Sequence, residues 1–209
     1  LLTTASTVKA DKFTDRVSTA AGVYRELIKV PDNGAPDYLR RNCRAVVIIP
    51  HVVKAALGVG GRHGRGVACA RGKDGTFGPP SFVSLSGGSV GFQIGASATD
   101  LVLFVMTERG MKSLLESKVT LGADATVAAG PVGRSAEAGT DIQFKSDIYA
   151  YARSKGAFAG VALDGSVLTT DDEAIEKFYG RKIKAKDILF ERRTPKMPSA
   201  AMKLMQVLP

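Results

Sequence analysis

The sequence contains few of the residues that most often carry chemistry. Its 209 residues include no tryptophan, two histidines and two cysteines. His51 and His63 are not spaced like metal ligands, and neither are the cysteines, so we expect no metal and no other cofactor. No stretch approaches the roughly 20 consecutive apolar residues of a membrane-spanning helix, so we expect no such helix within these residues.

Aromatic residues are also scarce where the charge is positive. The basic stretch 36–75 contains one aromatic residue, Tyr38. Proteins that bind single-stranded nucleic acid interleave stacking aromatics with lysine and arginine on one surface. No helix-turn-helix, RRM or KH signature is present either. We therefore expect no nucleic-acid partner.

The overall composition is that of an ordinary globular domain. Apolar residues make up 44% of the chain and charged residues 23%, which suffices for a core and argues against disorder. We assign residues 1–209 to one domain. Within it we expect an N-terminal amphipathic helix at 1–30, a glycine-rich β core at 44–168, and C-terminal helices with a basic tail at 171–209.

Short β-type segments punctured by glycine run from residue 57 to residue 106. Glycine inside a strand marks a bulge, a bend or a close backbone approach. Its frequency here predicts an α+β fold whose core is a strongly curved antiparallel sheet or barrel, with short helices packed around it. We interpret GVGGRHGRG (58–66) as a tight turn that exposes Arg62, His63 and Arg65. Strands are expected at 44–49 (ended by Pro50), 53–60, 65–71, 81–86, 89–95 and 100–106.

Several local signals mark the ends of elements. Thr107 is placed to cap a helix over 107–117. Asp164-Gly165 lies between two apolar arms, which is a strong hairpin signal. Gly180 follows a short helix with acidic residues in its first turn and is expected to end it.

One motif resembles a catalytic site. GGSVG at 87–91 matches the G-x-S-x-G nucleophile elbow, with Ser89 as the candidate nucleophile. That elbow needs a helix after the serine and a histidine later in the chain. Both histidines precede Ser89, and another β-type run follows it. A glycine-kinked hairpin is the better interpretation, and we expect the chain not to be an enzyme.

The positive charge is concentrated in two separate stretches. The chain carries a net charge of +9. Residues 36–75 hold eight basic and two acidic side chains, as do residues 181–209, whereas residues 76–180 are acidic overall. This asymmetry predicts a basic face for an anionic partner such as a lipid surface or an acidic protein. A surface that only improves solubility is the alternative.

Two further features leave alternatives open. Cys43 and Cys69 lie at the ends of expected strands, where they form either a disulfide or two buried thiols. The N-terminal helix has an apolar face containing Phe13, Val17 and Tyr24. That face either packs on the sheet or contacts a membrane.

The strand-rich region resembles the SYLF domain family over residues 20–190. The most similar segments are AVVIIPHVVKAALGVGGRHGRGVACAR, SFVSLSGGSVGFQIGASATDLVLFVM, LGADATVAAGPVGR, IYAYARSKGAFAGVALDGSVL and FYG. The resemblance implies a non-enzymatic domain that binds anionic lipid, phosphoinositides in eukaryotic members. Certain fungal members also bind and bundle actin.

The chain looks more like the bacterial, exported form of this family. In that form a cysteine pair placed like Cys43 and Cys69 would be a disulfide. We expect a periplasmic or cell-envelope protein whose signal segment is missing from this chain. Its expected partner is an anionic phospholipid surface, with an acidic protein of the cell envelope as the alternative.

The residues that we expect to bind follow from the charge pattern and the helix. The candidate lipid-binding residues are Arg40, Arg41, Lys54, Arg62, Arg65, Arg181, Lys182 and Lys184. The candidate membrane-contact residues of the N-terminal helix are Lys9, Lys12, Phe13, Arg16 and Val17.

Overall fold

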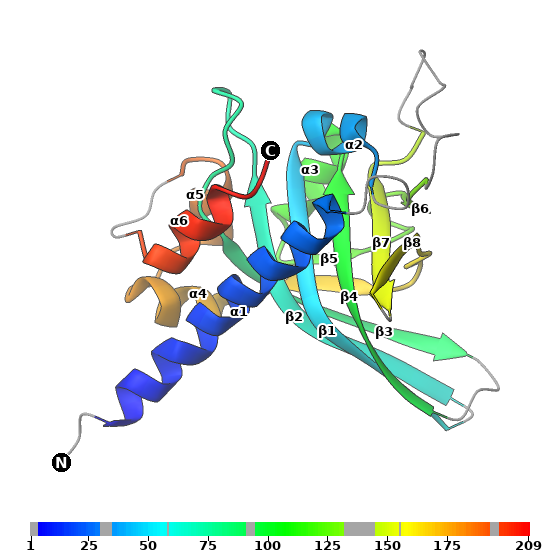
Figure 1. The fold of residues 1–209 in the computed structure, drawn as a ribbon, viewed down its shortest axis with the longest axis horizontal. Helices are drawn as coiled ribbons and strands as arrows, with labels where there is room; N and C mark the ends of the chain where they lie inside the picture. Colours follow the sequence, from blue (N-terminus) through cyan, green and yellow to red (C-terminus); the bar gives the residue numbers. More distant parts are fainter. Residues whose placement is uncertain are drawn as a thin grey trace.

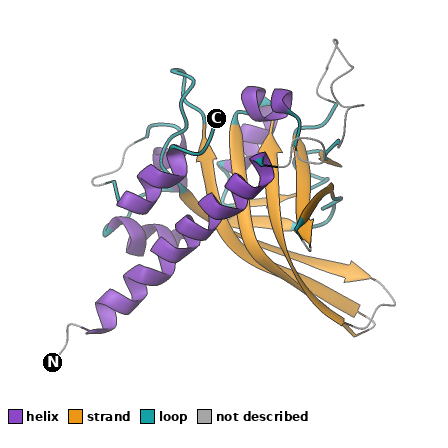
Figure 2. Ribbon diagram, viewed as in Figure 1, coloured by secondary structure: helices purple, strands orange, loops and turns teal. Residues whose placement is uncertain are grey.

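The fold is a single curled sheet with helices packed around it (Figures 1 and 2). The computed structural model describes residues 4–29, 35–57, 59–90, 95–131, 145–154, 156–192 and 197–209. The described strands are β1 (Ala45–Leu57), β2 (Val59–Ala70), β3 (Ser81–Val90), β4 (Gly95–Val105), β5 (Lys118–Thr120), β6 (Val127–Ala129), β7 (Ile148–Ser154), β8 (Ala157–Gly160) and β9 (Val167–Thr170). The described helices are α1 (Thr4–Ile28), α2 (Asp37–Asn42), α3 (Glu108–Leu114), α4 (Asp172–Tyr179), α5 (Ala185–Leu189) and α6 (Ser199–Met205).

The sheet has the order β5-β9-β3-β2-β1-β4-β7-β6, and β8 pairs with β7. It curls into a half-barrel, so the predicted α+β class and curved sheet are confirmed. The sheet is mixed, because β6 runs parallel to β7. The predicted turn at Asp164-Gly165 forms, with Gly165 at φ 73°. Its arms do not pair with each other, however: β8 pairs with β7, while β9 pairs with β3 and β5.

Strand β1 is longer than the sequence predicted. We expected Pro50 to end it, but β1 continues to Leu57 through a β-bulge at which the register with both neighbouring strands shifts. His51 in this bulge has φ 51°. Its backbone N–H donates to Oδ1 of Asp100 on β4 at 2.9 Å. Proline is tolerated here because a bulge leaves a position in the strand that needs no ladder hydrogen bond.

The segment predicted as a turn at 58–66 is a strand over its described part, 59–66. The glycines allow β2 to lie close against the bulge of β1. A Cβ on Gly66 would lie 2.1 Å from the carbonyl oxygen of Ile48, and a Cβ on Gly64 would lie 2.6 Å from Cγ2 of Val52. The glycine pattern therefore reflects close packing of two strands, and the expectation of a turn was wrong.

Two apolar cores lie on opposite faces of the sheet. The inner face of the half-barrel holds Val47, Leu85 and Leu103 with residues from α3 and β9. The outer face holds Ile48, Phe82 and Phe104, and α1 packs across it. The figures show α1 crossing this face diagonally, with its N-terminal turns extending beyond the sheet (Figure 2).

The apolar side of α1 belongs to the outer core. Phe13, Val17 and Tyr24 are 8%, 0% and 1% exposed. The Phe13 ring meets Phe82 edge-on, with ring centroids 5.9 Å apart. Of the two alternatives for this face, packing on the sheet is the one that forms, so Phe13 and Val17 cannot contact a bilayer in this conformation. The side chain of Lys9 lies outside the described part of the chain.

The two cysteines are free and buried, so the implied disulfide is wrong for this fold. Cys69 on β2 lies opposite Val46 on β1. Val46 is three residues after Cys43 in the chain. Three strand residues span roughly 10 Å, which is beyond the reach of a disulfide. The Cys43 thiol instead donates to the carbonyl oxygen of Arg40 at 3.2 Å.

A thiol count tests this correction. We expect two free thiols per chain in denaturant without reductant, and the same number after reduction. In the native protein both thiols should react slowly, because burial raises the pKa of Cys43 to about 11 and raises that of Cys69 further. Absence of free thiols until a reductant is added would restore the disulfide.

Candidate functional site

Seven of the eight cations predicted to form one basic face lie at three separate places, and the eighth, Arg65, lies at a fourth, on the face of β2 that α1 covers. The labelled elements that carry them can be followed in Figure 1. Arg40 and Arg41 are in α2, at one end of the long strands. Lys54 and Arg62 lie toward the other end, and the stretch of β1 from Ala45 to Lys54 spans roughly 30 Å at the usual strand rise. Arg181, Lys182 and Lys184 lie in the connection between α4 and α5. The structure thus does not gather these residues on one face.

The α2 group is partly neutralised within its own helix. Arg40 forms an ion pair with Asp37, and Arg41 lies 3.5 Å from the same carboxylate. The Arg40 carbonyl oxygen also accepts a hydrogen bond from Arg71 at 3.0 Å. The hydrogen bond from Arg71, which directly follows β2, holds α2 against the end of that strand. The contacts with Asp37 leave this group less positive than its sequence suggests.

Cations from distant parts of the chain do meet beside the N-terminal half of α1. We call this site the α1 cavity. It has a volume of about 190 Å³ and is lined by Lys12, Phe13, Arg65, Asp171, Glu173, Ala174 and Lys177. It brings together α1, β2 and the start of α4.

Arg16 contacts two residues that line the α1 cavity, Asp171 and Phe13. Its side chain is 8% exposed, and Nη1 donates to Oδ2 of Asp171 at 3.2 Å. The guanidinium also lies 5.5 Å from the ring centroids of both Phe13 and Phe82. Burial lowers the pKa of Arg16, and the bond to Asp171 opposes that shift. Arg16 is therefore held in place by contacts within the protein.

The side chains that line the α1 cavity include more basic than acidic groups. Lys177 is paired with Glu173, and Asp171 both pairs with Arg16 and caps α4 through the Ala174 N–H. Lys12 and Arg65 are exposed, and neither has an ion-pair partner among the described residues. Lys12 and Arg65, which we call the rim of the α1 cavity, are thus its two lining cations without an ion pair in the described part of the chain, an arrangement that can bind an anion.

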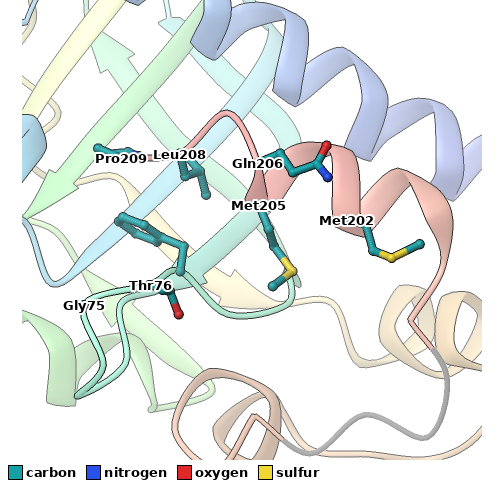
Figure 3. A pocket seen from close by; sticks show the side chains of 8 residues that line it. Gly75, Thr76, Met202, Met205, Gln206, Leu208 and Pro209 are labelled. Carbon is teal, nitrogen blue, oxygen red and sulfur yellow. The ribbon is translucent and has the colours of Figure 1, made fainter.

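A second cavity is apolar and lies at the end of the described chain (Figure 3). It has a volume of about 430 Å³ and is lined by Gly75, Thr76, Phe77, Met202, Met205, Gln206, Leu208 and Pro209. Arg192 fixes its wall by donating to Asp74 at 2.8 Å and to the Thr76 hydroxyl at 2.8 Å. The hydrogen bond from Arg192, and next those that the hydroxyl and backbone N–H of Thr76 donate to the same carboxylate, lower the pKa of Asp74 to about 2.

No catalytic arrangement accompanies these cavities in the described residues. Ser89 lies inside strand β3, opposite Gly60 of β2, so the backbone lacks the strand–turn–helix of a nucleophile elbow. In the part of the chain that the structure describes, no three histidine, cysteine or acidic residues group as metal ligands do. Nor does any described helix have the length and apolarity needed to cross a bilayer.

Sequence reasoning found three of the seven residues that line the α1 cavity, Lys12, Phe13 and Arg65, but not their proximity. Lys12, Arg16 and Arg65 were predicted as parts of two different groups. Lys177 was missed, although its spacing of four residues from Glu173 is the ordinary signal of a helical ion pair. No sequence signal relates Arg65 to Lys12, because only the packing of α1 on β2 brings them together.

A comparison with known families identifies the class of protein. Residues 86–209 match the family model Ysc84, described as Las17-binding protein actin regulator. The chain therefore belongs to the Ysc84 (SYLF) family, and the resemblance to that family seen in the sequence is confirmed.

Relatives of this chain occur in yeast and mammals. It is 39% identical over 197 residues to Protein YSC84 of Saccharomyces cerevisiae, covering 90% of this chain and 42% of the relative. It is 41% identical over 176 residues to LAS seventeen-binding protein 3 of the same yeast, covering 83% and 38%. It is 35% identical over 195 residues to human SH3 domain-containing YSC84-like protein 1, covering 90% and 56%. The chain thus spans about half the length of these curated relatives or less.

These relatives are eukaryotic, and the name of one of them, LAS seventeen-binding protein 3, describes a binding protein. They lend no support to the bacterial origin that we expected. The exported location stays a prediction.

Proposed function

We propose that this chain is a non-enzymatic module that binds anionic membrane lipid through the rim of the α1 cavity. The observation that carries the proposal is the meeting of Lys12 and Arg65 at one cavity, where both are exposed and have no ion-pair partner among the described residues. The ion pair between Arg16 and Asp171 lies next to them. A lysine or arginine close to an anionic bilayer contributes about 1 kcal/mol of binding free energy. The N-terminal turns of α1, which precede Lys12, extend beyond the sheet (Figure 1).

Membrane contact in this proposal is electrostatic. Phe13 and Val17 are in the core, so α1 supplies cations while its apolar face holds the helix on the sheet. Binding of this kind weakens as salt screens the charges. It also needs several cations at once, because one lysine or arginine alone contributes little.

A vesicle-binding experiment tests the proposal. The protein should sediment with phosphatidylcholine vesicles that contain phosphatidylserine, less so at high salt, and not with phosphatidylcholine alone. Lys12→Gln and Arg65→Gln should each weaken binding about fivefold, and the double variant about 30-fold, since each removes about 1 kcal/mol. Lys118→Gln is a matched control, because it removes an exposed cation from β5, which β9 and β3 separate from the strand of Arg65.

Binding that ignores salt and phosphatidylserine content would contradict the electrostatic mechanism. Equal loss of binding in the double variant and in Lys118→Gln would show that only net charge matters, and would contradict the α1 cavity as the site.

A second candidate is binding to a protein partner in actin regulation. The names of the family and of the second yeast relative, which refer to Las17, favour it. The same two cations would then contact acidic groups of that partner. Under this alternative, purified Las17 or actin would bind the wild type and bind the double variant more weakly, while vesicles would bind neither.

A further inference from the structure

A second group of cations lies on the inner face of the half-barrel, on the opposite side of the sheet from α1. Lys54 on β1 lies directly opposite Arg62 on β2. Their row continues to Ser97 on β4 beyond Lys54 and to Gly87 on β3 beyond Arg62. Residues directly opposite each other in neighbouring strands point to the same face. The two cations therefore lie side by side.

The contacts of Gly64 and the alternation of side chains along β1 and β2 establish that Lys54 and Arg62 lie on the inner face. A Cβ on Gly64 would touch Val52 and Ile49, both of the inner core. Arg62 lies two residues from Gly64 in β2, and Lys54 lies two residues from Val52 in β1. Since side chains alternate along a strand, all four positions face inward. The pair is thus separated by the sheet from the α1 cavity, to which Arg65 contributes.

No acidic side chain compensates this pair in the described rows around it. The next row toward the core holds Thr99, Val52, Gly64 and Leu85. In the other direction, toward the connection between β1 and β2, the next row contains Ala56 opposite Gly60. Neither Lys54 nor Arg62 has an ion-pair partner among the described residues. Like charges directly opposite each other destabilise a sheet, so the row is strained unless an anion lies between the two cations.

Polar atoms without partners border the same row. The Nε of Arg62 is shielded from water and has no hydrogen-bond acceptor, and the hydroxyl of Ser166 is in the same condition. Both adjoin Gly87: Arg62 is its cross-strand neighbour, and a Cβ on Gly87 would lie 2.9 Å from Oγ of Ser166. Buried donors normally have partners. Here the Nε of Arg62 and the hydroxyl of Ser166 lie beside Gly87, which has no side chain to fill the space next to them.

We propose that Lys54 and Arg62 form a binding site for a phosphate monoester on the inner face of the half-barrel. Arginine offers a planar fork of donors and lysine a compact charge, a combination suited to a phosphate group. A phosphate monoester carries close to two negative charges at neutral pH, which matches the two cations. A carboxylate would neutralise only one of them. The shared chemistry fits a free phosphate ester and the head group of phosphatidic acid alike.

Thermal unfolding in the presence of inorganic phosphate and of glycerol 3-phosphate tests the site. Both should raise the Tm of the wild type above its value in sodium chloride of equal ionic strength. Lys54→Gln and Arg62→Gln should each weaken binding about tenfold or more, because each removes charge-assisted hydrogen bonds. Without phosphate, the same variants should have a Tm equal to or above that of the wild type, because they remove the repulsion between like charges.

Two controls separate this site from the proposed function. Lys118→Gln, on β5, should leave the phosphate-dependent rise in Tm unchanged. So should the Lys12→Gln/Arg65→Gln double variant, whose defect is in vesicle binding. Loss of the rise in that double variant as well would show that phosphate acts at the α1 cavity, and would overturn the site proposed here.

The source of the phosphate is decided with vesicles. If vesicles of phosphatidylcholine and phosphatidic acid compete with glycerol 3-phosphate and lose affinity in Arg62→Gln, the site takes a lipid head group. If glycerol 3-phosphate binds but these vesicles do not compete, the site takes a soluble ester. A wild type whose Tm is the same in phosphate and in chloride overturns the site, as does a rise in Tm that persists in both Lys54→Gln and Arg62→Gln.

Discussion

Replacing Asp147 with alanine is expected to lower the free energy of unfolding by about 3 kcal/mol. The Asp147 side chain is 7% exposed and joins three segments of the fold. It accepts hydrogen bonds from the backbone N–H of Thr126 at 2.9 Å, from the Thr126 hydroxyl at 2.8 Å, and from Nε of Arg109 at 3.0 Å. The hydroxyl of Thr107 donates to it as well. The alanine variant leaves several of these donors without an acceptor.

The same carboxylate makes stability depend on pH. Burial by itself would raise the pKa of Asp147, but the hydrogen bonds from Thr107, Arg109 and Thr126 lower it to about 2, from an ordinary 3.8. A group with a lowered pKa stabilises the fold above its ordinary pKa and loses that contribution as the pH falls toward the lowered value. Between pH 4 and pH 2, Asp147 should thus contribute a loss of about 2 kcal/mol.

Urea unfolding at several pH values, on the wild type and on Asp147→Asn, measures this contribution. The difference in stability between the two proteins should be largest at neutral pH and shrink as the pH falls from about 4 to about 2. Asp15→Asn is the control, because Asp15 is exposed on α1; its unfolding free energy should stay within about 0.5 kcal/mol of the wild type. A constant difference between wild type and Asp147→Asn down to pH 2 would contradict the lowered pKa.

Replacing Gly66 with alanine is expected to destabilise the fold by about 3 kcal/mol, although it adds only one methyl group. That methyl carbon would lie 2.1 Å from the Ile48 carbonyl oxygen and 2.7 Å from Cα of Ile49. Both contacts are with the backbone of β1, which cannot move away because its other edge is hydrogen-bonded to β4. Relief therefore requires β1 and β2 to separate at the bulge.

Gly88→Ala provides the matched control for this effect. Gly88 is also a strand glycine, but nothing lies within 4 Å of the position that its Cβ would occupy. Alanine there should leave the Tm unchanged or raise it slightly, because glycine weakens a strand interior. If Gly66→Ala and Gly88→Ala unfold at the same temperature, the close approach of β1 and β2 is not what requires glycine at position 66.

Local elements could be predicted well because their causes lie within a few residues. Thr107 caps α3 by accepting the Gly110 N–H at 3.0 Å, as its position before the helix indicated. Gly180 ends α4 in the left-handed conformation with φ 73°, which glycine adopts without steric cost. The apolar spacing of α1 likewise predicted a helix with one side for the core.

Predictions that depended on strand register failed more often. The glycines at 58–66 were expected to make a turn, yet Gly64 and Gly66 serve a close contact with β1 that only the paired strands reveal. Pro50 was expected to end a strand, yet it lies in a bulge. Cys43 and Cys69 are offset along the two strands that were expected to join them.

The sequence by itself determined a curved sheet and an amphipathic N-terminal helix, since these features follow from residue spacing and backbone preference. Only the tertiary structure decided which cations meet. It placed Lys12 beside Arg65 at the α1 cavity and Lys54 beside Arg62 on the inner face. The net charge of a chain does not depend on the order of its residues, but the attraction between its charges and a ligand depends on the distances between them. That distance is set by how the strands pair and how α1 packs on them.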